Sequence, residues 1–582
     1  MASPTIHGVS FRTVACCLLA VVGAFAPCAF AVQPLQPEVP PPDPQFNRLY
    51  HNDEIVAFLH GYAASYPEWV RLESIGKAGE GGDMWLVTIN NPATGDELEK
   101  PAMYIDGAIH ANEVQGTETA LYVIDYLLRN YGRLEPVTEL LDRAVFHFVP
   151  MVNPDSRAKW FDEPSTSSYP RTAPVHIDDD RDGRIDEDGY DDLDGDGEIT
   201  QMRKRVPLGE GGYRLHPKDP RRLVAVEEDE LGDYIRLGSE GIDNDGDGRL
   251  NEDSVGYVDP NRTWGYGWQP RYVQSGTTQY PLQIPETRSI ALWALDHPNI
   301  IAAQSFHNSG RMILRGPGAK TMRRYEMADA QVYDRIGEEG ENILPGYNYY
   351  VLWKDLYTAY GGTLDHFYGI HGAISFSNEL FGPEQDFDGD GSVSEEERFK
   401  FIDRLTHGRM FVDWKEIDHP QYGTVEVGGY RHDTSRVPEG WLLEEECHRN
   451  ASFVFYHASH MPRLSFGEPT VEHLGGNLWR LSVPVLNDRA IPSMTAVARQ
   501  LKLHRPDIAT LDGAEVISSG IVQDAYLDRV DVQKHRPERL LVGGVPGLST
   551  KTLFFLVEGK GDVTVTYDSL KAGKIQRSVD LR

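Results

Sequence analysis

The sequence predicts an α/β domain that is interrupted by an acidic insertion and followed by a β-sandwich. Three observations indicate this organisation. Between residues 46 and 460, apolar runs of strand length alternate with helical patterns. Within this region, residues 156–255 are polar, rich in Asp and Gly, and poor in apolar periodicity. From residue 461 to residue 582, short alternating runs separated by Gly, Pro and Asp are typical of an antiparallel β-sandwich.

The N-terminal segment has the pattern of an export signal. Arg12 precedes an apolar stretch at residues 14–25, and a small-x-small cleavage site follows at residues 29–31. We therefore expect residues 1–31 to be a signal peptide and the protein to be exported, to the periplasm or the cell exterior. The proline-rich residues 32–45 are expected to form an extended linker.

Length and composition narrow the possible functions. A chain of 582 residues is too long for one compact core, and we expect two to four domains. The formal net charge of −33 disfavours binding to nucleic acid or to anionic membrane surfaces. Only Cys447 lies outside the predicted signal peptide, so no internal disulfide is expected. No apolar run is long enough to span a membrane. We expect a soluble mature protein stabilised by metal ions; its oligomeric state stays open.

Strands and helices are predicted in alternation along the α/β domain. Strands are expected at residues 84–90, 102–109, 145–152, 300–306 and 373–378. Helices are expected at residues 52–66, 117–128, 285–296, 322–342, 395–417 and 440–459, and another begins within 361–368. Asn52 is expected to cap the first helix. In the C-terminal domain, strands are expected at residues 478–485, 516–522, 540–542 and 552–557.

Four acidic loops share the spacing Asp-x-Asp-x-Asp-Gly or one close to it. Alternate Asp side chains can wrap oxygen ligands around a hard cation, and the Gly provides the sharp turn. The fourth loop also has Glu397 at its twelfth position, where a bidentate carboxylate belongs. We expect structural Ca²⁺ rather than a calcium sensor, and solvated loops without metal are the alternative. The predicted ligands are Asp178, Asp180, Asp182, Asp192, Asp194, Asp196, Asp243, Asp245, Asp247, Asp386, Asp388, Asp390 and Glu397.

A metal site of a different kind is predicted at the end of the strand 102–109. His110 and Glu113 follow this strand, and imidazole nitrogen and carboxylate oxygen are ligands that suit zinc. Two ligands do not make a site, so a third must come from a distant part of the chain. His307, at the end of a later predicted strand, is the candidate.

Further side chains with catalytic potential lie on loops and strand ends. Asn261 and Arg262 are adjacent, and Arg can clamp a carboxylate because it is bidentate and always charged. Tyr357 lies on a loop that contains Gly-Gly and is expected to be able to swing. Glu379 lies at the end of an apolar strand. Burying a carboxylate there costs folding free energy, so its presence indicates a functional role.

The order of these motifs resembles the zinc carboxypeptidase family, the carboxypeptidase A-like metallopeptidases. The resemblance covers about residues 46–459 without most of the insertion. The sequence LYTAYGGTLD at residues 356–365 and the downstream Glu379 are similar to the tyrosine loop and catalytic glutamate of that family. Residues 419–429 resemble bacterial members. The resemblance implies a mixed central sheet with flanking helices and one catalytic zinc ion.

The resemblance also implies a role for each candidate residue. His110, Glu113 and His307 would hold the zinc, with water in the fourth position. Glu379 would be the general base that activates this water and then protonates the leaving amine. The substrate's terminal carboxylate would be bound by Asn261 and Arg262, with Tyr357 closing over it.

Two further roles follow from the resemblance. An arginine that stabilises the oxyanion is expected between Glu113 and Asn261. Arg203 is the first choice and Arg205 the alternative, because the alignment is ambiguous by two residues. Leu364 would line the side-chain pocket, and an apolar residue there disfavours a requirement for Lys or Arg at the substrate terminus.

The sequence thus favours an exported zinc metallocarboxypeptidase that hydrolyses the C-terminal peptide bond of peptides or proteins. One alternative is a peptidase of the same fold that cuts peptidoglycan stem peptides. The presence of both the Asn261-Arg262 pair and Tyr357 favours a substrate with a free carboxylate. A second alternative is a calcium-stabilised binding or adhesion protein with a vestigial site, although no proposed ligand, base or clamp residue is missing.

Overall fold

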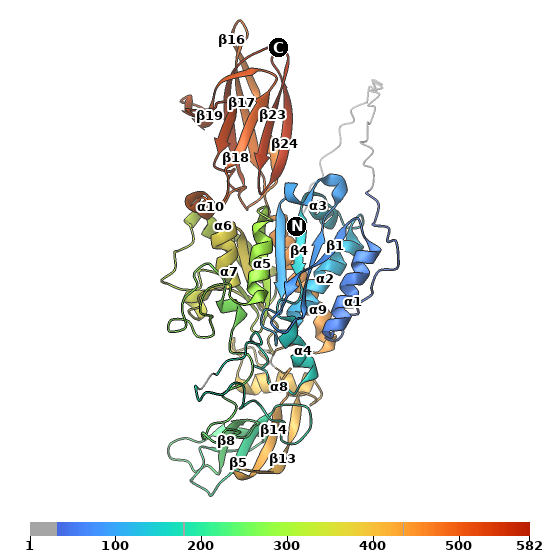
Figure 1. Ribbon diagram of the computed structural model, residues 1–582, viewed down its shortest axis with the longest axis vertical. Helices are drawn as coiled ribbons and strands as arrows, with labels where there is room; N and C mark the ends of the chain where they lie inside the picture. Colours follow the sequence, from blue (N-terminus) through green and yellow to red (C-terminus); the bar gives the residue numbers. More distant parts are fainter. Residues whose placement is uncertain (1–31, 179–180, 384, 435) are drawn as a thin grey trace, which may run out of the picture.

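The computed structural model describes residues 32–178, 181–383, 385–434 and 436–582 (Figure 1). The predicted signal peptide, residues 1–31, and the predicted calcium ligand Asp180 lie outside the described residues. The chain forms an elongated molecule, with the α/β domain in the middle, the C-terminal β domain at one end and a smaller β unit at the other. Among the helices of the described residues, none combines the length and apolar character needed to cross a membrane.

A mixed sheet of eight strands forms the centre of the α/β domain, in the order β1-β2-β4-β3-β9-β12-β10-β11. The strands are β1 (Val70–Lys77), β2 (Asp83–Ile89), β3 (Ala102–Gly107), β4 (Val145–Val149), β9 (Ile300–Asn308), β10 (Met312–Arg315), β11 (Asn348–Val351) and β12 (Ile374–Leu380). Strands β4, β3, β9 and β12 run parallel, so their carboxyl ends meet at one edge of the sheet. The predicted α/β class and mixed sheet are confirmed.

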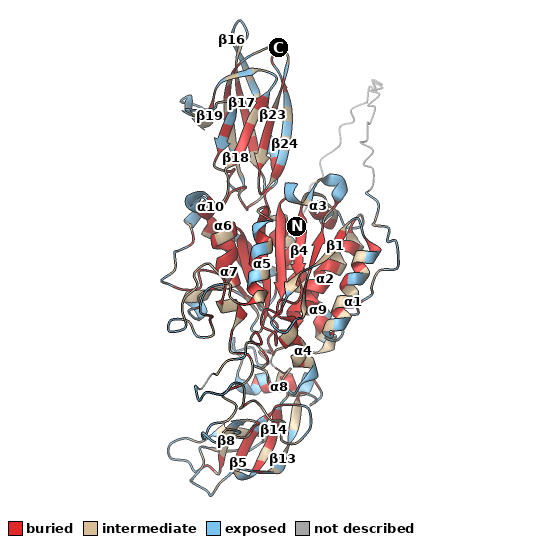
Figure 2. Cartoon of the chain, in the orientation of Figure 1, coloured by how far each residue is buried: buried red, intermediate tan, exposed pale blue. Residues whose placement is uncertain are grey.

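Helices pack on both faces of the sheet, and its central strands β3 and β9 are therefore buried along their whole length (Figure 2). The helices are α1 (Asn52–Ser65), α2 (Gln115–Asn130), α3 (Glu135–Arg143), α4 (Pro154–Asp162), α5 (Pro285–Leu295), α6 (Met327–Ile343), α7 (Thr363–His366) and α9 (Gly440–Ser459). Leu121 and Ile124 of α2 lie in the core on one side of the sheet, and Ile290 of α5 lies in the core on the other. Burying each such side chain contributes roughly 1.5–3 kcal/mol. Asn52 begins α1, whereas His51 is its N-cap, so the predicted cap is wrong by one residue.

Part of the acidic insertion folds as a sheet. Strands β5 (Gln201–Arg205), β6 (Tyr213–His216), β7 (Asp219–Ala225) and β8 (Tyr234–Ser239) join two later strands, β13 (Phe411–His419) and β14 (Gly423–Tyr430). The predicted helix 395–417 is therefore wrong in its second half, since helix α8 ends at Leu405 (Glu395–Leu405). Gly408, with φ of 80°, adopts a left-handed conformation that ends helical geometry before β13 begins.

The C-terminal domain consists of two antiparallel sheets, consistent with the predicted β-sandwich. One sheet contains β15 (Leu464–Phe466), β16 (Thr470–Gly475), β17 (Leu478–Asn487), β19 (Glu515–Asp524), β20 (Arg529–Val532) and β22 (Ser549–Glu558). The other contains β18 (Asp507–Asp512), β21 (Arg539–Val542), β23 (Asp562–Ser569) and β24 (Gly573–Asp580). Buried residues of both sheets, such as Val483, Phe555 and Val565, form one core.

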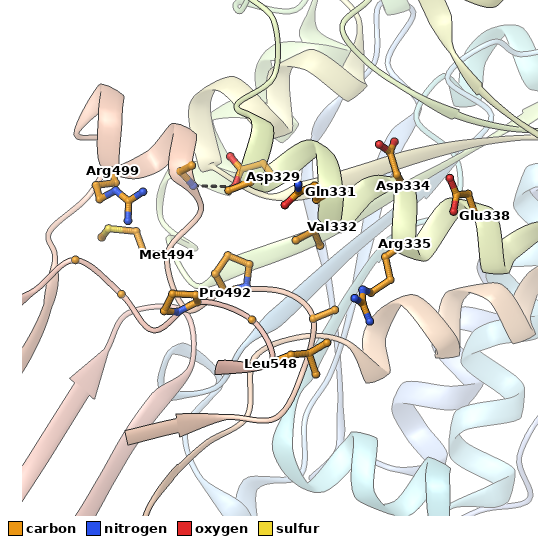
Figure 3. A pocket seen from close by; sticks show the side chains of 17 residues that line it. Asp329, Gln331, Val332, Asp334, Arg335, Glu338, Pro492, Met494, Arg499 and Leu548 are labelled. Carbon is orange, nitrogen blue, oxygen red and sulfur yellow. Dashed lines mark hydrogen bonds between the residues drawn. The ribbon is translucent and has the colours of Figure 1, made fainter. Parts of the chain in front are cut away.

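The C-terminal domain contacts α6 of the α/β domain through a short helix, α10 (Ala496–Leu501). The Asp329 carboxylate accepts hydrogen bonds from the backbone N–H groups of Ala496, at 2.8 Å, and Val497, at 2.9 Å. An open groove beside this contact is lined by Arg335, Arg499 and other residues of the two domains (Figure 3). Asp329 thus satisfies orphan backbone donors at the N-terminus of α10.

A second interdomain contact is made by Lys571, whose amino group is buried and donates a hydrogen bond to the carbonyl of Ile300 at the start of β9. Burial lowers the pKa of Lys571 to about 7. In the unfolded chain a Lys has a pKa of about 10.4, so between these values the unfolded state binds the additional proton. The free energy of unfolding should therefore rise as the pH increases from about 7 to about 10.

Replacing Lys571 by Met should remove this pH dependence. Between about pH 7 and about pH 9.5, the wild type should gain unfolding free energy relative to Lys571→Met, by an amount on the order of a few kcal/mol. Denaturant unfolding of both proteins at the two pH values measures the difference. A difference that does not change with pH would show that the ammonium group stays charged and paired in the folded protein.

Candidate active site

Three buried side chains converge beyond the carboxyl ends of β3 and β9. His110 Nδ1 lies 3.1 Å from Glu113 Oε1, and His307 Nδ1 lies 2.8 Å from Glu113 Oε2 and 3.1 Å from His110 Nδ1. These are the three predicted zinc ligands. A tetrahedral zinc ion with bonds of about 2.0–2.1 Å separates its ligand atoms by roughly 3.3 Å, so the donor types and their spacing fit this metal.

The turn between β3 and α2 presents His110 and Glu113. It packs tightly on the first turn of the helix, since a Cβ on Gly107 would lie 2.6 Å from the backbone carbonyl of Gly116. Glycine is therefore needed at residue 107 for this close approach. His307 is positioned differently, by the parallel register of β9 with β12, which places it beside Glu379.

The second ring nitrogen of each histidine also has a partner. His110 Nε2 lies 3.0 Å from Asp259 Oδ1. His307 Nε2 lies 3.2 Å from Ser305 Oγ, which donates a hydrogen bond of 2.5 Å to Asp106 Oδ1. Such partners orient the ring and leave Nδ1 available for a metal. Burial raises the pKa of Asp106 to about 6, while the hydrogen bond from Ser305 opposes this rise.

Glu379 lines the same cavity as two of the candidate ligands, His110 and His307. The cavity is lined by residues from five separate parts of the chain, including His110, Asn261, Arg262, His307, Tyr357, Leu364 and Glu379. Burial, and next the negative charge of Glu113, raise the pKa of Glu379, whereas His307, His110 and Arg171 lower it. The net rise makes this carboxylate a better proton acceptor than an ordinary glutamate.

The predicted carboxylate clamp lies in the same cavity. The Asn261 amide oxygen accepts hydrogen bonds from Thr363 N, at 2.8 Å, and from Thr363 Oγ1, at 3.0 Å. Asn261 therefore anchors the loop that carries Tyr357. The Tyr357 side chain lines the cavity, and the residue is 52% exposed, as expected for a side chain that can move over a substrate.

Residues 55–169 match the sequence profile of the zinc carboxypeptidase family, and residues 463–580 match a domain of unknown function. Carboxypeptidase D from Homo sapiens is 35% identical over 128 residues, which cover 22% of this chain and 9% of that protein. The resemblance to zinc carboxypeptidases is confirmed. Carboxypeptidase B from Astacus astacus is 33% identical over 113 residues, which cover 19% of this chain and 35% of that protein. The chain thus spans only a small part of the length of these carboxypeptidases.

The solved structure of thrombin activatable fibrinolysis inhibitor aligns with 71% of this chain and 75% of its own, at 16% identity and a TM-score of 0.42. The family match itself, residues 55–169, contains His110 and Glu113. The remaining candidate residues of the zinc carboxypeptidase-like site lie outside it.

Neither predicted oxyanion arginine lies at this site. Arg203 belongs to β5 in the insertion sheet, where its Nε donates a 2.5 Å hydrogen bond to Glu426 and its guanidinium lies 3.9 Å from the centre of the Trp414 ring. Arg205 is exposed at the end of the same strand and faces Asp233. Both predictions are wrong, because the basic run to which they belong forms part of a separate sheet.

Arg171 lies at the zinc carboxypeptidase-like site instead. Its Nη1 lies 2.5 Å from Glu113 Oε1, and its Nη2 lies 3.0 Å from His110 Nε2. Burial disfavours the charged guanidinium, but the carboxylates of Glu113 and Asp259 outweigh this effect and raise the pKa of Arg171. Arg171 falls between Glu113 and Asn261 in the sequence, the interval in which the oxyanion arginine is expected. Arg171 stands alone between Pro170 and Thr172, and no local pattern identifies it.

The described residues of the four acidic loops share one hydrogen-bond pattern. In each loop the first Asp accepts hydrogen bonds from the backbone N–H groups of the fourth and sixth loop positions. These first residues are Asp178, Asp192, Asp243 and Asp386. Glu397 folds back onto the fourth loop and accepts a hydrogen bond of 2.7 Å from Phe387 N. Their binding of calcium stays a prediction.

Proposed function

We propose that the protein is a zinc metallocarboxypeptidase that removes C-terminal residues from peptides or proteins. The proposal depends on one observation: Glu379 and Arg262 line the same cavity as His110 and His307. A proton acceptor, a group that binds carboxylates and a set of metal ligands within one cavity are what this hydrolysis needs. We further propose export to the periplasm or the cell exterior, on the basis of the signal-like N-terminal sequence.

His110, Glu113 and His307 would hold the zinc. When bound there, zinc would polarise the substrate carbonyl and lower the pKa of a coordinated water. Glu379 would take a proton from that water and pass it to the leaving amine. Asp259 Oδ1 lies 3.0 Å from His110 Nε2 and would accept a hydrogen bond from that nitrogen, which would leave Nδ1 free for the metal.

The substrate would be held by side chains next to the candidate metal ligands. Arg262 would form a bidentate ion pair with the terminal carboxylate. Because the amide oxygen of Asn261 accepts hydrogen bonds from Thr363, its amide nitrogen is the group that would donate to the same carboxylate. Arg171 would stabilise the negative charge that develops on the carbonyl oxygen. Tyr357 would close over the bound terminus and exclude water.

The proposed activity can be tested with N-blocked dipeptides. We expect release of the C-terminal amino acid from dipeptides with a free carboxylate, inhibition by 1,10-phenanthroline, and recovery after zinc is added. The amidated dipeptide is the matched control, because it lacks the charge that Arg262 would bind. Equal cleavage of the amidated dipeptide would contradict a carboxypeptidase, and cleavage of peptidoglycan stem peptides alone would favour the cell-wall alternative.

The side-chain pocket predicts a preference for apolar C-terminal residues. Leu314, Leu352 and Leu364 line the cavity, and Leu364 is buried. Leu364→Asp would introduce a carboxylate without an internal partner, which should disfavour apolar termini and attract basic ones. We expect kcat/KM for C-terminal Leu to fall roughly tenfold or more and that for Lys to rise. Competition between the two substrates measures the change, and an unchanged ratio would place the specificity pocket elsewhere.

We also propose that the acidic loops hold structural Ca²⁺. Calcium removal should lower thermal stability and affect activity only through the structure that the loops maintain, whereas zinc removal should abolish activity directly.

A further inference from the structure

The two ends of the insertion run side by side. The outgoing limb, residues 171–178 and 181–188, and the returning limb, residues 243–259, are connected by backbone hydrogen bonds. Ala173 N donates to Val258 O at 2.8 Å, and Asp253 N donates to Asp188 O at 3.1 Å. At one end of this pair, the limbs deliver Arg171 and Asp259 to the active site.

At the other end of the pair, carboxylates from both limbs meet. Asp188 from the outgoing limb lies with Asp243 and Asp245 from the returning limb, and one carboxylate oxygen from each is within 4.8 Å of the others. Asp188 does not belong to any Asp-x-Asp-x-Asp-Gly triplet. No Lys or Arg side chain in the described parts of the chain forms an ion pair with any of the three. Such close carboxylates repel one another unless a cation lies among them.

Asp188 provides an independent reason to expect a ligand. The residue is 1% exposed, and its Oδ1 accepts a hydrogen bond of 3.2 Å from Asn244 Nδ2. Its other oxygen, Oδ2, is also buried and has no hydrogen-bond partner among the residues that the structure describes. Burying a carboxylate oxygen without a hydrogen-bond partner costs folding free energy, and a bound cation would offset that cost.

We propose that Asp188, Asp243 and Asp245 bind a divalent cation of the calcium type that joins the two limbs. The ligands are all oxygens, as hard cations require, and the half-buried Asp243 and Asp245 leave room for water. The site differs from a calcium ion held within a single loop, because its ligands come from segments more than fifty residues apart. By holding the limbs together, the cation positions Arg171 and Asp259 beside His110.

The consequence for catalysis rests on the proposed peptidase function, whereas the consequence for calcium binding does not. A cation that binds only the joined limbs stabilises them by RT ln(1 + [L]/Kd). Without it, the two limbs can separate, and Arg171 and Asp259 lose their fixed positions. We therefore expect calcium to raise kcat at constant zinc content.

The test uses the full chain, titrated with Ca²⁺ by calorimetry after treatment with EGTA. Asp188→Asn and Asp243→Asn, on opposite limbs, should each lose one bound calcium or weaken it at least tenfold, and the double variant should lose no further ion. The matched control is Asp229→Asn, which changes an exposed acidic residue in the same insertion. It should bind as many ions as the wild type and have the same kcat.

Asp188→Asn should also expose residues 189–242 to proteases in the presence of calcium and lower kcat, while zinc content stays constant. In EGTA its protease sensitivity should equal that of the wild type, which separates loss of the cation from misfolding. An unchanged number and affinity of calcium ions in Asp188→Asn would overturn the site. Normal kcat despite loss of the ion would overturn its coupling to the active site. If the wild type proves to have no peptidase activity, calorimetry and proteolysis still decide the calcium site.

Discussion

Replacing Glu379 by Gln is expected to abolish turnover while one zinc ion stays bound. Glutamine has nearly the same volume, but it cannot accept the proton that the proposed mechanism transfers. Glu379 lies beside His307 at the end of β12 but is not one of the three converging ligands. A general base contributes about 10²–10⁴-fold to the rate, so kcat should fall by at least that much. Steady-state kinetics and metal analysis of the same sample measure both properties.

Glu446→Gln is a suitable control for this experiment. Glu446 is also a buried glutamate, with a pKa raised first by burial, but it lies on α9 and accepts a hydrogen bond from the Tyr347 hydroxyl. This variant should retain kcat. Loss of zinc from Glu379→Gln would show that Glu379 has a structural role, and near-normal turnover would exclude it as the base.

Removing the Arg171 side chain is expected to have the second largest effect. Arg171→Ala should lower kcat by about 10²–10³-fold, the usual effect of losing one donor to a developing oxyanion. Arg203→Ala, by contrast, should leave kcat nearly unchanged. It should lower the stability of the insertion sheet, because Arg203 is buried and contacts Glu426 and the Trp414 ring. Kinetics and thermal unfolding of the two variants separate the two roles.

The opposite result would support Arg203, the residue predicted from the sequence, as the arginine that stabilises the oxyanion. If Arg203→Ala lost activity while retaining stability, and Arg171→Ala were active, the position of the insertion relative to the zinc site would have to be revised. Arg171→Lys adds a useful comparison, because lysine keeps the charge but cannot form two parallel hydrogen bonds. We expect it to recover only part of the activity.

The parts of the fold that were predictable from the sequence are those with strong burial patterns. Strand β3 is buried along its whole length, and α2 has a broad apolar face, so both were found with errors of a few residues. The insertion sheet was missed because β5 pairs with β14, more than two hundred residues away, and both strands are partly exposed. In residues 395–417, charged and apolar residues alternate in a way that also suits a helix, and Gly408 was the signal for its end.

The same distinction holds for the candidate site. His110 and Glu113 are three residues apart, so a local motif was sufficient to find them. His307 and Glu379 required only that two apolar strands end at the same edge of a sheet. Arg171 belongs to no motif and to no strand end. It lies on a loop, and only the fold of that loop brings its side chain to Glu113. Asp259 directly precedes Pro260-Asn261-Arg262, and its proximity to that motif could have indicated it.

The most direct test of the account is the location of zinc in the crystallised protein, determined by anomalous diffraction at the zinc absorption edge. We predict one peak beyond the carboxyl end of β9, about 2.0–2.1 Å from Nδ1 of both His110 and His307 and within bonding distance of the Glu113 carboxylate. Glu379 should lie close to the open coordination position without binding the metal. A zinc ion bound elsewhere, or one that His307 does not contact, would contradict the proposed active site.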